Sequence, residues 1–343
     1  MQREITQPDR LLNEEGELKT KGYSKKMILE YDRQHIKAPF YKIKEWDYYL
    51  ISNEEFAIAL TVADNSYLGL VSVSLLDFRY PWYKTTSVLI PFTFGRLKLP
   101  STSQKGNIQY KNRKVQVEFL NNGVTRNLRM YMKNFNGHKD FECDFLLYDE
   151  PEDSVVMAIP FEEDRKAFYY NQKINCIKVQ GIARYDDKEY AFHPKSSFAT
   201  LDWGRGVWTY NNTWYWGSAS GLVDGKPFGF NIGYGFGDTS AATENMLFYE
   251  GKAHKLSDVS FEIPIIEEEY KYMEPWRFTS SDQRFEMSFT PILDREDFMS
   301  VGIISSDQHQ VFGLFSGRAI LDNGEIIHVE NFLGFAERVS NKW

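Results

Sequence analysis

Beyond Trp46 the chain consists of short β-type segments separated by turn residues, and this pattern limits the possible folds more than any other feature. The segments 46–52, 55–64 and 67–78 are rich in β-branched and aromatic residues, and Asn, Asp, Glu and Ser separate them. No helical stretch of about 10–15 residues lies between them, so βαβ units are not expected. The sequence therefore predicts an all-β protein of about twenty short strands with little helix.

So many strands are not expected to form one open sheet, because large sheets curl, split or close. The 343 residues suffice for two consecutive β units of about 150 residues each. We therefore expect two tandem antiparallel barrels or strongly curled sheets.

The rhythm of strands and turns is interrupted once, by the segment 148–173. This segment contains Pro151, Pro160 and two acidic clusters. We place the boundary between the two units here, which predicts an N-terminal arm over residues 1–35, a first β-barrel domain over 36–165 and a second β-barrel domain with the candidate site over 166–343.

The composition excludes several classes of partner. The net charge of -8 and the pI near 5.4 leave no basic excess to bind nucleic acid. Cys143 and Cys176 are the two cysteines, and we expect two free thiols in a reducing compartment. The first residues lack the apolar segment of a signal peptide, and no apolar run is long enough to span a membrane. These features predict a cytoplasmic protein.

The sequence lacks the common metal and cofactor motifs. Its six histidines form no H-x-H or H-E-x-x-H arrangement, and it contains neither a nucleophile elbow nor a Walker A loop. We expect no metal and no cofactor. A small molecule, apolar or saccharide, is the expected partner, and the oligomeric state stays open.

The segment 227–237 alternates between large and small residues without a break. From Phe228 on, even positions hold Phe, Ile or Tyr, whereas odd positions hold Gly except for Asn231. As a strand it would have one aromatic face and one nearly bare face, and glycines inside a strand need a reason. Either indole rings cover the bare backbone or a ligand approaches it. Both hold if Trp214 and Trp216 form the wall between this strand and a cavity.

Four charged residues lie within or at the ends of apolar segments in this region: Asp202, Arg205, Asp238 and Glu244. A carboxyl group with a raised pKa can transfer a proton in a cavity, so Asp202, Glu244 and Asp238 are the candidate catalytic residues. Two carboxyl groups in different environments could divide the acid and base roles. The structural alternatives are an ion pair between Asp202 and Arg205, and a turn or N-cap role for Asp238.

Aromatic and polar side chains around these charges could contact a ligand. The segment 168–173 adds polar and aromatic residues, although it could equally be the edge of a hairpin. The predicted substrate-binding residues are Arg205, Trp203, Trp208, Trp214, Trp216, Asn231, Tyr170, Asn171, Lys173 and Asn245.

Several motifs resemble those of the DUF2804 family. They are LDWGRGVW, WYWGSASG, GFNIGYGFGDTSAATEN and GKAHKL, together with YYNQKINC, FGLFSG and FLGFAERV. That family is remotely similar to a group with two tandem lipocalin-like (calycin-like) barrels, which includes carotenoid 1,2-hydratases and tocopherol cyclase-like proteins. The resemblance implies this architecture and an acid–base step on a ligand in a barrel cavity. No catalytic residue can be transferred by motif.

Three functions remain open. The first is an acid–base enzyme of hydratase, cyclase or lyase type with an aromatic-lined barrel cavity. The second is a carbohydrate-active hydrolase with a carboxylate pair and Trp or Tyr platforms. The third is a non-catalytic lipocalin-like binder. An enzyme should leave a carboxylate oxygen facing the cavity unpaired, whereas a binder should pair every charge.

Overall fold

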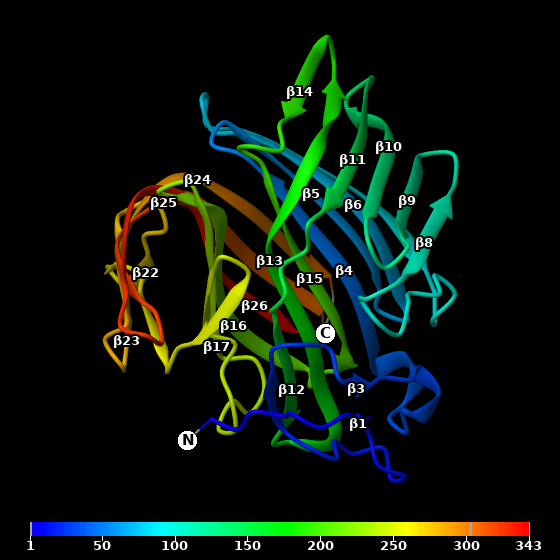
Figure 1. Ribbon diagram of the computed structural model, residues 1–343. Coiled ribbons are helices and arrows are strands. Elements are labelled where there is room, and N and C mark those ends of the chain that lie inside the picture. The colour runs from blue at the N-terminus through cyan, green and yellow to red at the C-terminus, as the bar shows by residue number, and fades with distance from the viewer. Residues whose placement is uncertain (1, 302–303, 343) are drawn as a thin grey trace.

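The computed structural model describes residues 2–301 and 304–342 and confirms the all-β prediction (Figure 1). Two strongly curled antiparallel sheets make up most of the chain. The helical residues in the described ranges form two 3-10 turns, η1 (Arg33–His35) and η2 (Phe40–Lys42). None of the described helices is long and apolar enough to cross a membrane.

The first sheet follows the order β7-β6-β5-β4-β15-β13-β11-β10-β9-β8. Outside this order, β12 and β14 pair with β13, and β2 pairs with β12. Its strands are β2 (Gly22–Ser24), β4 (Ile43–Ser52), β5 (Phe56–Asp64), β6 (Leu68–Asp77), β7 (Trp82–Pro91), β8 (Gly106–Lys111), β9 (Val115–Asn121), β10 (Arg126–Asn136), β11 (Lys139–Tyr148), β12 (Val155–Phe161), β13 (Asp164–Tyr185), β14 (Lys188–Phe192) and β15 (Phe198–Val207).

The second sheet follows the order β19-β18-β17-β16-β26-β25-β24-β23-β20. Its strands are β16 (Asn211–Val223), β17 (Lys226–Tyr234), β18 (Met246–Tyr249), β19 (Lys252–Lys255), β20 (Val259–Glu262), β23 (Trp276–Ser280), β24 (Phe285–Val301), β25 (Ile304–Ile320) and β26 (Ile326–Lys342). Two small pairs complete the structure, namely β1 (Asp9–Arg10) with β3 (Leu29–Glu30) and β21 (Ile265–Ile266) with β22 (Glu269–Tyr270).

The strand pairing does not follow the boundary placed at residues 165 and 166. β13 and β15 pair with β11 and β4 of the first sheet, so the pairing changes from one sheet to the other between Val207 and Asn211. The prolines and acidic residues that suggested a boundary lie instead around β12. Proline is tolerated at Pro160 because β12 is short and lies off the main path of the sheet.

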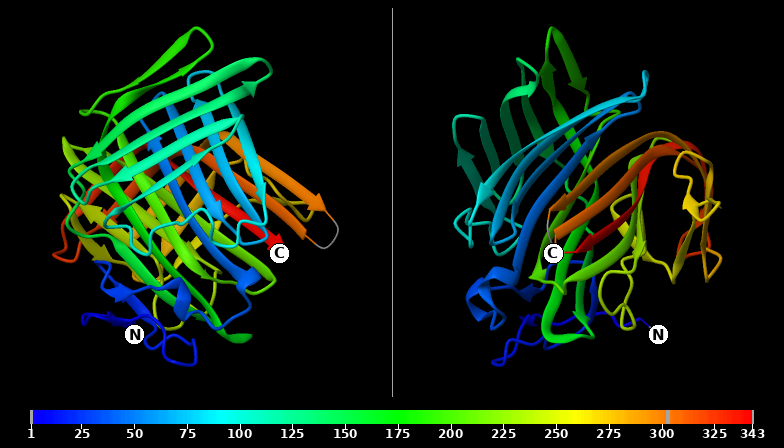
Figure 2. Two further views of the ribbon diagram at one scale, coloured as in Figure 1. Left: turned by 90° about the vertical axis from the view of Figure 1, so that its right-hand side faces the viewer. Right: turned by 180° about the vertical axis from the view of Figure 1, so that it is seen from behind.

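Three apolar clusters form the core, one inside each sheet and one between the two sheets. Alternate residues of each strand point to opposite faces, so Tyr49 and Ile51 of β4 enter the core inside the first sheet. Tyr48 and Leu50 point the other way and pack against Phe335 and other residues of the second sheet. A separate core fills the inside of the second sheet. The sheets therefore meet back to back, as the view from behind shows (Figure 2).

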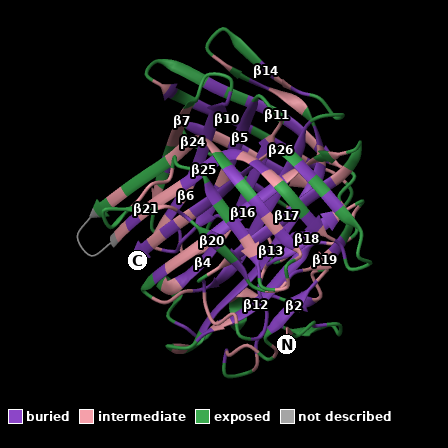
Figure 3. Cartoon of the chain, turned by 90° about the vertical axis from the view of Figure 1, so that its left-hand side faces the viewer, coloured by how far each residue is buried: buried purple, intermediate pink, exposed green. Residues whose placement is uncertain are grey.

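Burial follows this arrangement (Figure 3). Exposed residues gather in outer hairpins such as the one that ends in β14, whereas most of β13 and β18 is buried. β13 is buried because it belongs to the first sheet and also crosses the back of β16 and β17.

The bare face of β17 lies against β13 and Glu244, which is neither of the two arrangements expected for it. Phe228 and the other large residues of β17 lie in the second core. On the other face, a Cβ atom on Gly229 would lie 2.7 Å from Cys176 Sγ, and one on Gly233 would overlap Glu244 Oε1. These glycines therefore let the first sheet and one acidic side chain approach the backbone closely.

Candidate functional site

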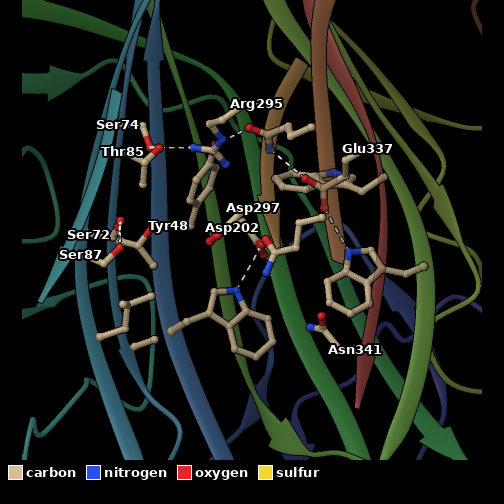
Figure 4. Close-up of a pocket in the computed structure, with 18 of the residues that line it drawn as sticks. Tyr48, Ser72, Ser74, Thr85, Ser87, Asp202, Arg295, Asp297, Glu337 and Asn341 are labelled. Atoms are coloured by element: carbon tan, nitrogen blue, oxygen red, sulfur yellow. Dashed lines mark hydrogen bonds between the residues drawn. The ribbon is translucent and has the colours of Figure 1, made fainter. Parts of the chain in front are cut away.

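A cavity of about 780 Å³ lies between the two sheets (Figure 4). Several of the predicted site residues come together around it. It is not enclosed by either barrel alone, because strands of both sheets form its walls. β4–β7, β13 and β15 supply one wall, whereas β16 and β24–β26 supply the other. This volume falls in the range of cavities that hold drug-sized ligands.

The wall of the first sheet carries one cross-strand row of polar residues. Residues that are paired across neighbouring strands point to the same face. The register places Lys173 beside Asp202 and Asp202 beside Tyr48. The row then continues through Thr61, Ser72 and Ser87. A row of aligned residues from six strands thus faces the cavity.

The wall of the second sheet carries a corresponding row. Trp216 of β16 pairs with Glu337 of β26, Glu337 pairs with Gln310 of β25, and Gln310 pairs with Arg295 of β24. The neighbouring row, which includes Phe335 and Phe312, is apolar and packs against the first sheet. The polar row therefore begins where the apolar contact between the sheets ends.

Asp202 is the best-connected carboxylate in the cavity. Its Oδ1 accepts a hydrogen bond from Asn171 Nδ2 at 2.5 Å and forms an ion pair with Lys173 Nζ at 3.1 Å. Its Oδ2 accepts a hydrogen bond from Trp46 Nε1 at 3.1 Å. Trp46 reaches this position because it lies directly over Gly204, where any Cβ atom would overlap its indole ring.

Lys173 lies between two carboxyl groups. Its ammonium is 3.1 Å from Asp202 and 3.7 Å from Glu244 Oε2, and it lies 3.9 Å from the centre of the Trp216 ring. The side chain is almost completely buried, so a lysine here needs such partners. The single positive charge of Lys173 therefore compensates the burial of these two carboxyl groups only in part.

Glu244 comes from the loop that follows β17. Its Oε2 accepts a hydrogen bond from Asn231 Nδ2 at 3.0 Å, and Asn231 Oδ1 accepts one from Trp216 Nε1 at 2.7 Å. Burial raises the pKa of the Glu244 carboxyl, although the Lys173 charge and the Asn231 hydrogen bond oppose this effect. The N-terminal arm supports the loop, because Gln2 accepts a hydrogen bond from the Thr243 N–H.

Glu337 is a buried acid that sequence reasoning did not select. Trp214 Nε1 donates to its Oε1 at 3.1 Å, and Gln310 Nε2 donates to its Oε2 at 2.8 Å. No described Lys, Arg or His nitrogen lies within ion-pair distance of it. Burial raises the pKa of the Glu337 carboxyl to about 7, against the opposing effects of these two hydrogen bonds and of the more distant Arg295 and Lys173 charges.

An aromatic wall adjoins these acids. Trp208 and Phe236 contact each other with ring centres 4.9 Å apart, and Trp46 contacts Trp208 at 5.1 Å. Trp214 and Tyr169 extend the same group of rings. Most of these contacts are edge to face, so the rings form one continuous wall.

Three predicted residues lie on the opposite face of their strands, away from the cavity. Trp203 and Arg205 alternate with Asp202 on β15, so they point into the first core. Arg205 pairs with Asp47 at 2.9 Å, and the proposed ion pair with Asp202 is therefore not formed. Tyr170 is also buried there and donates to the Leu29 carbonyl.

Two more predicted residues have structural contacts outside the cavity. Asp238 Oδ1 accepts the Ser240 N–H, as its turn alternative predicted, and Asp238 also pairs with Lys21 at 3.2 Å. The Ser240 hydrogen bonds lower the pKa of its carboxyl. Asn245 binds the Gly233 N–H and the Ser257 carbonyl, which places the Glu244 loop.

One group in the described ranges has the spacing of potential metal ligands. Asp294, Glu296 and His309 offer ligand atoms within 4.8 Å of one another. His309 Nδ1 lies 2.7 Å from Asp294 Oδ2, and the ring stacks on Tyr272. A hydrogen-bonded pair accounts for this geometry, and we assign no metal here.

A comparison with family models matches residues 2–343 to the family described as a domain of unknown function, DUF2804. The chain belongs to the DUF2804 family. A sequence search of curated proteins finds no significant match to this DUF2804 member.

Three solved structures are similar to this DUF2804 protein at low sequence identity. An AttH candidate from Nitrosomonas europaea has a TM-score of 0.53 at 14% identity and covers 90% of this chain and 96% of its own. Kievitone hydratase from Nectria haematococca has a TM-score of 0.46 at 11% identity, with 88% of each chain covered. CghA, crystallised with Sch210972, has a TM-score of 0.48 at 9% identity, also with 88% of each chain covered.

Proposed function

We propose that this DUF2804 protein is an acid–base enzyme of hydratase, cyclase or lyase type that acts in the cavity between its sheets. The observation that carries the proposal is Glu337. A carboxyl group with a pKa near 7 is populated in both protonation states at neutral pH, which suits a general acid or base. It lies beside Trp214 and Trp216 in a cavity large enough for a ligand.

The second carboxyl group in this proposal is Asp202. It lies in the other wall of the same cavity and has Lys173 at 3.1 Å, whereas Glu337 has only neutral donors as hydrogen-bond partners. Different surroundings allow two acids to divide the roles. We assign proton donation to Glu337 and proton acceptance to Asp202, with Lys173 orienting Asp202.

The wall of rings indicates the body of the ligand. Trp46, Tyr169, Trp208, Trp214 and Phe236 give an apolar surface next to both acids. Their edge-to-face packing leaves fewer open ring faces than a saccharide platform requires. We therefore favour an aromatic or isoprenoid substrate, protonated or deprotonated at a carbon next to a double bond.

Deuterium transfer tests the proposal without knowledge of the natural substrate. Aryl alkenes, aryl enones and aryl ketones that quench the tryptophan fluorescence would be incubated with the protein in D₂O, and mass spectrometry would measure deuterium bound to carbon. We expect wild type to label at least one compound and Glu337→Gln to label it roughly 100-fold more slowly. Glu330→Gln, an exposed position on the same strand, should match wild type.

The alternative outcome is a non-catalytic binder, and one observation favours it. Both oxygens of Asp202 and both oxygens of Glu337 already have protein partners, as expected of groups that only hold the walls together. Compounds that quench fluorescence but acquire no deuterium, or equal labelling by Glu337→Gln, would contradict the acid–base proposal and support this alternative.

A further inference from the structure

Arg295 projects from the second sheet across the cavity to the first. It lies on β24 in the same cross-strand row as Glu337, and its Nη1 donates to Ser74 Oγ on β6 at 3.1 Å (Figure 4). It is half-buried and lines the cavity. Within residues 2–301 and 304–342, no carboxylate oxygen lies close enough to Arg295 to form an ion pair, for which the limit is 4.0 Å.

Two buried arginines differ from Arg295, because each forms an ion pair with a carboxylate. Arg205 is completely buried and has Asp47 at 2.9 Å, and Arg126 has Glu150 at 2.8 Å. This is the expected rule, since a buried cation requires a countercharge. The half-buried Arg295 has no such carboxylate partner among the described residues. Its charge acts on the cavity itself, where it lowers the pKa of Glu337 against the effect of burial.

Hydroxyl groups surround the end of the cavity that Arg295 reaches. Ser74 Oγ lies 2.8 Å from Thr85 Oγ1, and Ser87 Oγ lies 2.9 Å from Ser72 Oγ. All four residues belong to β6 and β7 and line the cavity, and no described acidic side chain of these two strands lines it. Hydroxyl groups can donate to an anion, and a guanidinium presents several donors in a planar fork.

We infer that the ligand carries an anionic oxygen group, such as a carboxylate, which Arg295 binds with the help of the β6 and β7 hydroxyl groups. The ligand is thus an amphipathic acid, with its apolar body against the aromatic wall. Glu296 and Asp297 follow Arg295 on β24 and also line the cavity, but both side chains are exposed, so solvent screens their charges. This inference rests on the proposed use of the cavity as a ligand site, but not on the acid–base step.

Two fluorescent probes with the same body separate the contribution of the anion. 8-Anilinonaphthalene-1-sulfonate carries one sulfonate, and N-phenyl-1-naphthylamine is the same molecule without it. Titration of each probe gives the ratio of the two affinities. We expect Arg295→Gln to weaken binding of the sulfonate probe roughly tenfold or more and to leave the neutral probe within about twofold of wild type.

Two further variants keep the test decisive. Arg295→Lys retains the charge and should preserve most of the preference for the sulfonate probe, including in the case that Arg295→Gln folds poorly. Arg129→Gln, at an exposed arginine that pairs with Asp144, should match wild type with both probes. An equal loss for both probes, or an unchanged affinity ratio in Arg295→Gln, would overturn the inference. Failure of deuterium transfer would leave this result unaffected, because the titration measures binding alone.

Discussion

At the scale of single residues, Asp202 and Glu337 of the cavity differ in their partners rather than in their distance from solvent. Both are buried, but Asp202 has the Lys173 ammonium beside it, whereas Glu337 has two neutral N–H donors. A countercharge offsets the cost of burying a carboxylate far better than one or two neutral hydrogen bonds do. Burial therefore raises the pKa of the Glu337 carboxyl to about 7.

This shift predicts how stability depends on pH. The pKa of Glu337 rises from an ordinary 4.5 to about 7 on folding, so the folded state holds the proton more tightly. The resulting stability is present below the unfolded pKa and is lost as pH rises through 7. Glu337→Gln has no carboxyl group here and does not lose this stability. Between pH 4.5 and 8, the free energy of unfolding of the variant should therefore rise by roughly 3 kcal/mol relative to that of wild type.

Urea unfolding at a series of pH values measures this difference. Glu330→Gln serves as the control, because an exposed glutamate should not change the pH dependence of wild type. Parallel stability curves for wild type and Glu337→Gln would show that the folded protein does not hold this proton more tightly.

Several residues that the sequence analysis selected lie close together in the structure. Asp202, Lys173, Glu244, Trp214 and Trp216 were selected because they lie in short polar and aromatic motifs, and all line the cavity. Their catalytic and binding roles stay predictions.

Other cavity residues were missed because no local motif marks them. Glu337 and Arg295 face the cavity only through the register of β24, β25 and β26. The available signal was an acid in the mostly apolar segment FLGFAERV, which sequence reasoning used only for resemblance.

At the scale of elements, β13 joins the two halves of the molecule. This strand of 22 residues pairs with β11, β12, β14 and β15, and it also carries Lys173 into the cavity. Its register shifts between Ile174 and Ile177, where Cys176 has a φ of 60°. Such a bulge redirects side chains, and here it turns Asn175 toward the second sheet. Sequence patterns could not reveal the bulge, because the segment reads as a continuous β-strand.

Asn175 is predicted to stabilise the junction between the sheets. It is completely buried, and its Nδ2 lies within hydrogen-bond distance of the Ala219 and Phe230 carbonyls at 3.1 Å and of Ser218 Oγ at 2.8 Å. Asn175→Ala would leave these acceptors short of a donor in a dry interface. We expect a loss of about 1–3 kcal/mol in the free energy of unfolding, measured with urea.

The matched control for this prediction is Gln109→Ala, which removes an exposed amide from β8. It should change stability by less than about 0.5 kcal/mol. If Asn175→Ala were equally mild, the amide would contribute little to holding β13 against β16 and β17.

At the scale of the whole molecule, the strand count and turns predicted the architecture but not the division of the chain. Two-residue turns at Asp224-Gly225 and Glu250-Gly251 join neighbouring strands, and two curled sheets result. The pairing of β4 with β15 was not predictable, because it joins segments about 150 residues apart that share no local signal. That pairing also explains why the cavity lies between the sheets rather than inside the second one.

The back-to-back contact of the sheets predicts the last outcome. Phe312 of β25 is almost completely buried and contacts Phe78 of the first sheet and Phe335 of the second. Phe312→Ala would remove apolar contacts that join the halves, so we expect a loss of about 3–5 kcal/mol in the free energy of unfolding. Phe298→Ala, at a phenylalanine that is 75% exposed on the neighbouring β24, should cost less than about 0.5 kcal/mol.

Calorimetry adds a readout that distinguishes this junction from an ordinary core position. Wild type should unfold in one transition, because the apolar contact couples the sheets. In Phe312→Ala the coupling is weaker, so the calorimetric enthalpy should exceed the van't Hoff enthalpy as the sheets begin to unfold separately. A large destabilisation with equal enthalpies would show that the two sheets stay one cooperative unit through β13 alone.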